Sequence, residues 1–123
     1  MNLKDCYTKF GGDFDEVLGR LRREQTVQKF VYKFLDDKSF HLFEASMRDK
    51  NYEEALRAVH TLKGGCQNLS FTRLFKSSSL VTKALKENDW NKAVDMMPQL
   101  SKDYYETINA IEELNNSKEE SRQ

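Results

Sequence analysis

The stretch that decides the fold is Asn51–Phe71, which reads NYEEALRAVHTLKGGCQNLSF. Asn51 is a good helix N-cap residue, and Glu54 three positions later completes a reciprocal capping pair. Beyond this cap, apolar residues recur at spacings of four, three, four and three, which is the period of an amphipathic α-helix. The spacing predicts a helix over 52–69 with one buried face, formed by Ala55, Val59, Leu62, Cys66 and Leu69.

Neighbouring segments repeat the same helical period. The last of them begins at Asn88-Asp89 and contains Pro98, so we expect either a kink there or a short helix that restarts near Met97. Long amphipathic helices joined by short loops pack as antiparallel neighbours. The fold class expected is therefore all-α, an up-down-up-down antiparallel four-helix bundle with helices near 38–49, 52–69, 71–87 and 98–114.

Two additional short helices are predicted ahead of this bundle, within about 13–36. Asp13, with Glu16 three residues later, provides an N-cap pair for the first of them. We expect these N-terminal helices to cover one end or side of the bundle, so that residues 1–114 form a single domain with the bundle at about 38–114. Residues 115–123, NNSKEESRQ, carry no apolar anchor and are expected to form a flexible tail.

Composition limits the functions open to a chain of 123 residues. Twenty Lys and Arg balance twenty Asp and Glu, which excludes the basic footprint of a nucleic-acid binder and gives no general attraction to anionic membranes. No apolar run approaches the roughly 20 residues of a membrane span. The N-terminus also lacks the apolar stretch of a signal peptide. We therefore expect a soluble, cytoplasmic monomer that binds neither nucleic acid nor membrane.

The cysteines and histidines give no sign of a metal or cofactor site. Cys6 and Cys66 form neither a disulfide framework nor a Cys-x-x-Cys pair, and Cys66 falls on the apolar face of its helix. Two histidines without a Glu-x-x-His motif provide no ligand set for a metal centre. No cofactor and no bound metal are expected.

His60 breaks the pattern of its helix. At about 100° per residue, it points about 140° away from the centre of the apolar face, toward solvent. Lys63, Gly64 and Gln67 lie within about 60° of it on the same wheel. Each glycine inside a helix costs roughly 0.5–1 kcal/mol relative to alanine. We interpret Gly64 as an opening that gives a partner access to the imidazole, whereas Gly65 also fits close packing against a neighbouring helix.

The chemistry of this face fits a phosphoryl acceptor. Imidazole side chains have an ordinary pKa of about 6.5, so the neutral, nucleophilic form dominates at neutral pH. Lys63 could donate a charge-assisted hydrogen bond to a phosphoryl group on His60, and Gln67 could add a neutral donor. The sequence contains no Gly-rich nucleotide loop and no carboxylate pair for Mg²⁺. We therefore expect a phosphocarrier, with metal and activation supplied by its partner, rather than an autonomous enzyme.

The run His60-Thr61-Leu62-Lys63-Gly64, followed by Leu69, resembles the HxLKGxxxxLG motif of the histidine-containing phosphotransfer (HPt) domain family. The similarity spans about residues 13–113. The resemblance implies that His60 is the phosphoacceptor, Lys63 the adjacent cation and Gly64 the glycine that gives a partner access. Ser70 stands where the family usually has glycine. The resemblance also implies a stand-alone phosphorelay module that exchanges phosphoryl groups with an aspartate of response-regulator receiver domains. A hybrid sensor histidine kinase is a further implied partner, and Mg²⁺ is expected on the receiver.

A rim of residues surrounds His60 on the helical wheel extended in both directions. Its members lie within about 60° of the imidazole and combine apolar with charged character, which suits a transient partner surface. We expect this partner-binding rim to consist of Leu56, Arg57, Gly64 and Phe71. Leu56 and Phe71 also fit partial burial by adjacent helices.

Other interpretations of the same residues stay open. His60 and Lys63 also fit ordinary solvated positions on a helix, and Gln67 is equally compatible with plain surface. A helical adaptor that binds a receiver or kinase without exchanging phosphate is the alternative function. His41, with only aromatic Phe40 and Phe43 near it in sequence, is interpreted as structural.

Overall fold

The computed structural model describes the backbone of residues 1–121 and the side chains of residues 1–117. Helices are the only regular secondary structure within residues 1–121, which confirms the all-α fold class. The chain forms seven helices there: α1 (Leu3–Phe10), α2 (Phe14–Leu21), α3 (Glu24–Phe34), α4 (Ser39–Arg48), α5 (Tyr52–Leu69), α6 (Thr72–Lys86) and α7 (Trp90–Ser121).

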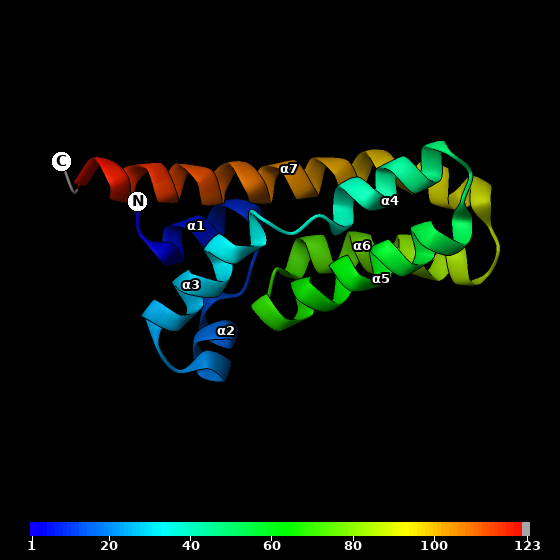
Figure 1. The fold of residues 1–123 in the computed structure, drawn as a ribbon. Helices are drawn as coiled ribbons and strands as arrows, with labels where there is room; N and C mark the ends of the chain where they lie inside the picture. The colour runs from blue at the N-terminus through cyan, green and yellow to red at the C-terminus, as the bar shows by residue number, and fades with distance from the viewer. Residues whose placement is uncertain (122–123) are drawn as a thin grey trace.

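The last four helices form the antiparallel bundle that the sequence predicts. Successive helices run in alternating directions, and α4 packs against α5, α5 against α6 and α6 against α7 (Figure 1). Each helix buries its apolar face in a common core. On α5 this buried face includes the whole predicted stripe, and the Asn51 side chain accepts a hydrogen bond from the Glu54 amide at 3.3 Å. The predicted N-cap and period of the central helix are therefore confirmed. The reciprocal half of the capping pair is wrong, because the Asn51 amide donates to the Ser46 carbonyl and the Glu54 carboxylate accepts from Arg57 instead.

Helix α1 is an element that the sequence analysis did not predict. Its residues Leu3, Cys6, Tyr7 and Phe10 are all buried, and Asn2 caps it by accepting a hydrogen bond from Asp5. The helix lies along α7, whose C-terminal half extends past the rest of the bundle (Figure 1). Eight residues are too few to be stable alone, so this helix exists because α7 offers an apolar surface to cover.

Of the two alternatives expected at Pro98, the helix that restarts near Met97 is wrong, because α7 runs through Pro98 as one element. The kink stays a prediction. Proline removes one backbone N–H donor, which leaves the carbonyl of Val94 without its helical partner. Pro98 and Val94 are both exposed, so water can satisfy that carbonyl. Ala93 and Leu100, on either side of the proline, are fully buried and hold both parts of the helix on the bundle.

The predicted end of the last helix at residue 114 is also wrong, since α7 continues to Ser121. Leu114 is fully buried, and the pairing of Lys9 with Glu113 at 2.9 Å ties this part of α7 to α1. An apolar anchor at Leu114 thus supports a helix that propagates several residues further. The flexibility of 115–123 stays a prediction, and its residues 122–123 lie outside the described part of the chain.

Candidate functional site

His60 lies in the middle of α5 with its imidazole exposed to solvent. The buried face of α5 is on the other side of the helix. Among residues 1–117, no hydrogen bond or ion pair involves the His60 side chain. His41 on α4 differs, because its Nδ1 lies 3.6 Å from a carboxylate oxygen of Glu44 and its ring packs on Phe40. The structure therefore places on the outer face of the central helix one imidazole that makes no hydrogen bond or ion pair with the described residues.

Lys63 and Gln67 share this outer face, one and two turns along α5 from His60. Lys63 is half-buried and Gln67 is exposed. Neither side chain engages in a hydrogen bond or ion pair with the described residues. Both are thus unoccupied donors on the same side of α5 as the imidazole, as the helical wheel predicts.

Gly64 and Gly65 leave the surface of α5 without side chains at two consecutive positions, of which Gly64 lies beside His60. A Cβ atom added at either position would meet no atom within 4 Å outside the helix's own backbone. The interpretation of Gly65 as a close-packing residue is therefore wrong, because no described atom of a neighbouring helix lies within 4 Å of a Cβ at this position. Gly64 leaves the α5 backbone open on the His60 face, whereas Gly65 leaves it open about 140° around the helix from His60.

Leu56 and Arg57 lie before His60 on α5 and remain available at the surface. Leu56 is half-buried against the core, and Arg57 is exposed. The Arg57 guanidinium forms ion pairs with Glu53 at 3.6 Å and Glu54 at 3.1 Å, on the preceding turn of α5. The cation is thereby partly neutralised within its own helix, at an exposed position where such pairs are weak.

Phe71 is fully buried, so its predicted place on the exposed rim is wrong. The wheel assumes about 100° per residue, but α5 ends at Leu69 and Ser70 adopts a left-handed conformation with φ of 56°. This residue turns the chain inward instead of continuing the helix. The Phe71 ring then packs between Phe10 at 4.8 Å and Phe34 at 5.0 Å between ring centroids.

The N-terminal helices hold this end of α5. The Tyr7 hydroxyl donates to the Leu69 carbonyl at 2.8 Å, and the Arg20 guanidinium donates to the Asn68 carbonyl at 2.6 Å. The Ser70 hydroxyl donates to the Glu16 carboxylate at 2.7 Å and accepts from Arg20 at 3.2 Å. Serine in a left-handed conformation is thus stabilised here by side-chain bonds that a glycine could not make. Sequence reasoning missed these hydrogen bonds because the residues that each bond joins lie about 50 to 60 positions apart.

Burial disfavours ionisation of the cysteine thiols and of two tyrosine hydroxyls elsewhere in the molecule. Burial raises the pKa of the Cys66 thiol well above its ordinary value, and burial next to Glu113 raises the pKa of Cys6 to about 12. Burial likewise raises the pKa of Tyr7 above its usual range and that of Tyr104 to about 12. Within the described residues, His, Cys, Asp and Glu side chains nowhere gather in threes as a metal site requires.

Together these features define a class: an antiparallel helical bundle whose central helix presents an unpaired histidine beside open backbone. The sequence matches the family model of the Hpt domain over residues 8–117, and the chain therefore belongs to the Hpt domain family. This family implies histidine phosphotransfer and contact with other phosphorelay components. No curated protein and no solved structure matches the chain significantly. Among the described residues, no helix is both long and apolar enough to cross a bilayer.

Proposed function

We propose that this chain is a histidine phosphotransfer protein that accepts and donates a phosphoryl group on His60. The single observation that carries the proposal is the position of His60, exposed and unpaired on α5 of an Hpt domain. The partner proposed is the phosphorylated aspartate of a response-regulator receiver domain. The chain itself is proposed to act as a cytoplasmic monomer, with a hybrid sensor histidine kinase as a further partner.

The transfer step needs only one nucleophile from this chain. The lone pair on an unprotonated ring nitrogen of His60 attacks the phosphorus of the aspartyl phosphate. As the N–P bond forms, the P–O bond to the aspartate breaks, and the carboxylate leaves with the electron pair. The receiver supplies the Mg²⁺ that neutralises charge on the phosphoryl oxygens. Reversal of the same step returns the phosphoryl group to a receiver.

The donors beside His60 support the transferred group. Lys63 provides an ammonium that is free of ion pairs with the described residues, and it is proposed to donate a charge-assisted hydrogen bond to the phosphoryl oxygens. Gln67 is proposed to add a neutral N–H donor from the next turn. The open backbone at Gly64 lets the receiver's active site approach without a side-chain clash.

The direct test is the intact mass of the protein after incubation with phosphorylated receiver domains and Mg²⁺. A gain of one phosphoryl group that is acid-labile and base-stable would support a phosphohistidine carrier. Receiver binding without any mass gain would overturn the phosphocarrier and favour the adaptor that binds without exchanging phosphate. Peptide mapping of the labelled protein then locates the phosphoryl group on the segment that contains His60.

Replacement of Lys63 by alanine is expected to slow phosphotransfer by about tenfold, the value of one charge-assisted hydrogen bond. Phosphotransfer rates from a phosphorylated receiver measure this effect. Lys76→Ala removes an exposed lysine from α6 and serves as the control for the loss of one positive charge. Equal rates for the wild type and both variants would remove Lys63 from the mechanism.

Replacement of Gly64 by leucine is expected to change stability and transfer in opposite directions. Leucine favours the helix over glycine by about 0.5–1 kcal/mol, and its Cβ meets nothing, so the free energy of unfolding should rise. The same side chain should obstruct the receiver and lower the transfer rate by roughly tenfold or more.

Gly19→Leu on α2 is the control for Gly64→Leu, because a Cβ at Gly19 also meets nothing within 4 Å. It should raise stability without slowing transfer. Urea unfolding and receiver-dependent phosphorylation, measured on the same samples, separate the two effects. A Gly64→Leu protein that transfers at the wild-type rate would refute the access role of this glycine.

A further inference from the structure

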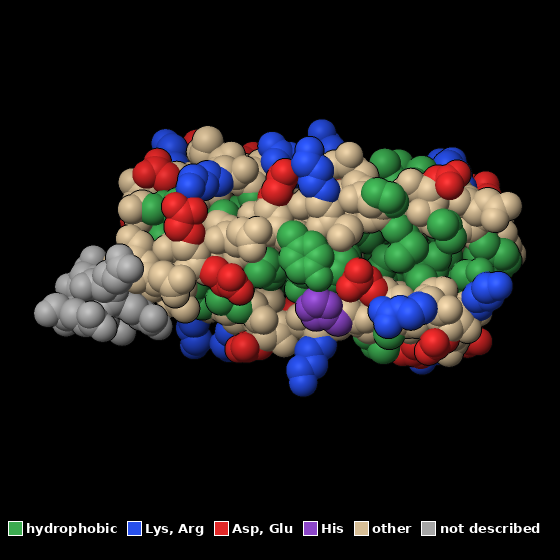
Figure 2. Space-filling model, turned by 90° about the horizontal axis from the view of Figure 1, so that it is seen from above, with side chains coloured by type: hydrophobic (Ala, Val, Ile, Leu, Met, Phe, Trp, Pro, Cys, Tyr) green, Lys and Arg blue, Asp and Glu red, His purple; other side chains and the backbone are tan. Residues whose placement is uncertain are grey.

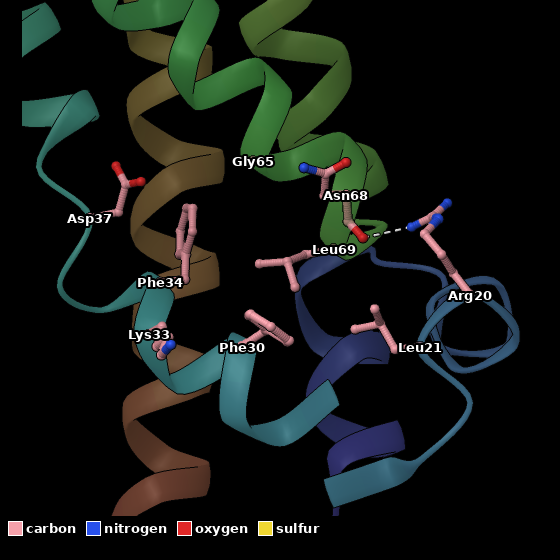
Figure 3. A pocket seen from close by; sticks show the side chains of 9 residues that line it. All are labelled: Arg20, Leu21, Phe30, Lys33, Phe34, Asp37, Gly65, Asn68 and Leu69. Atoms are coloured by element: carbon pink, nitrogen blue, oxygen red, sulfur yellow. Dashed lines mark hydrogen bonds between the residues drawn. The ribbon is translucent and has the colours of Figure 1, made fainter. Parts of the chain in front are cut away.

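A cleft of about 440 Å³ opens between the N-terminal helices and the C-terminal end of α5. Leu21 from α2, Phe30 from α3 and Leu69 from α5 point toward one another across it (Figure 3). Gly65 and Asn68 form its border on α5. Because Gly65 has no side chain, α5 leaves this border of the cleft open.

The mouth of this cleft lies within reach of any protein docked on His60. Gly65 and Asn68 follow His60 by five and eight residues, which is about 7.5 Å and 12 Å along a helix. A typical recognition surface covers about 800 Å² per partner, a patch about 30 Å across. Around α5, Asn68 lies about 80° and Gly65 about 140° from His60, so a partner centred on His60 reaches the cleft across its Asn68 border.

Phe30 is the residue of the cleft most suited to a partner. It is 41% exposed, an unusual condition for a phenylalanine, and its ring forms no contact with another aromatic ring of the described residues. The Lys33 ammonium lies 5.4 Å from the ring centroid. On the opposite wall, the Arg20 guanidinium donates a hydrogen bond to the carbonyl of Asn68 at 2.6 Å (Figure 3).

The chemistry of this cleft selects an apolar side chain next to negative charge. Its floor is apolar, and Arg20, Lys33 and Asp37 lie at its edge. Arg20 pairs with Glu16 at 3.4 Å, and the Asp37 carboxylate accepts hydrogen bonds from Ser39. The Lys33 ammonium is therefore the charge at this edge that no carboxylate of the described residues pairs. A receiver active site is acidic, since carboxylates must hold its Mg²⁺ beside the phosphorylated aspartate. The charges of the two surfaces are therefore complementary around an apolar centre, the arrangement of a transient interface with one anchor.

We infer that the cleft between α3 and α5 takes an apolar side chain of the receiver that docks on His60, with Phe30 as its anchor and Lys33 facing the receiver's acidic edge. This inference rests on the proposed phosphotransfer function. It assigns partner choice to the N-terminal helices, which contribute nothing to the phosphoryl chemistry itself.

The experiment compares two sources of phosphate for the same variants. Each receiver domain of the source organism is tested as donor, and phosphoramidate serves as a small donor that needs no docking surface. Phe30→Ala should raise the apparent KM for the receiver roughly tenfold, the effect of losing one aromatic anchor. Its labelling by phosphoramidate should equal that of the wild type. Lys33→Glu should weaken receiver transfer in the same way, because it reverses the charge beside the Phe30 ring while the ring itself is kept.

Tyr105→Ala is the matched control, because Tyr105 is 42% exposed on α7, which lies across the bundle from α5. Apolar side chains also gather on the face seen in Figure 2, toward α4 and α7, so a general loss of surface hydrophobicity would appear with this variant. An unchanged receiver KM for both Phe30→Ala and Lys33→Glu would overturn the inference and leave the phosphotransfer proposal standing. Absence of labelling of the wild type by every donor would overturn both.

Discussion

His60→Gln is expected to gain no phosphoryl group from any receiver, while the wild type gains one. Glutamine has a similar length and polarity, but its amide nitrogen is delocalised into the carbonyl and is not a nucleophile. Because the His60 side chain is exposed and makes no polar contact with the described residues, the substitution should alter the free energy of unfolding by no more than about 0.5 kcal/mol. Intact mass and circular dichroism of the same samples report the two properties.

His41→Gln supplies the control for this result. It removes the only other histidine of the chain, which pairs with Glu44 on α4. This variant should be labelled as fully as the wild type. Labelling that survives in His60→Gln and disappears in His41→Gln would move the phosphoacceptor to α4 and refute the site proposed on α5.

The second large effect is expected from Phe71→Ala, which should lower the free energy of unfolding by about 3–5 kcal/mol. Phe71 is fully buried, and its ring lies 4.8–5.7 Å from those of Tyr7, Phe10 and Phe34. Removing it opens a cavity where the N-terminal helices meet the bundle. Urea unfolding followed by circular dichroism measures the loss, which is large compared with the stability of an ordinary small domain.

Phe30→Ala is the matched comparison for Phe71→Ala, because it removes the same ring from a position that is 41% exposed. The loss of stability should be much smaller there, since most of that ring's apolar surface is already in water. A Phe71→Ala protein as stable as the wild type but deficient in receiver binding would contradict its role in the core. That outcome would restore Phe71 to the docking rim that the helical wheel predicts.

Several features of this protein follow from local sequence alone. The cap at Asn51 and the regular spacing of apolar residues determine α5 and its buried face, and this in turn places His60 on the outside. Within one helix the rotation per residue is constant, so the shared face of His60, Lys63 and Gln67 also follows from spacing. The antiparallel bundle is predictable for the same reason, because short loops leave consecutive amphipathic helices few other ways to pack.

Other features depend on contacts between residues that are distant in the chain. Helix α1 is stabilised by α7, and α7 continues through Pro98 because buried residues on both sides of the proline hold it against the bundle. Such tertiary packing outweighs local helix propensity. Phe71 becomes a core residue because Ser70 reverses the direction of the chain, supported by Glu16 and Arg20 from α2.

The region around Gly65 also combines features that local sequence determines with one that only tertiary packing determines. The sequence by itself determined the amphipathic helices, their order in the bundle and the outward direction of the histidine, because these depend on spacing within single segments. The tertiary structure alone decided that Phe30 and Gly65, 35 positions apart, border one open cleft at the C-terminal end of α5. No local pattern encodes that juxtaposition, since it arises only when the N-terminal helices pack against the end of α5.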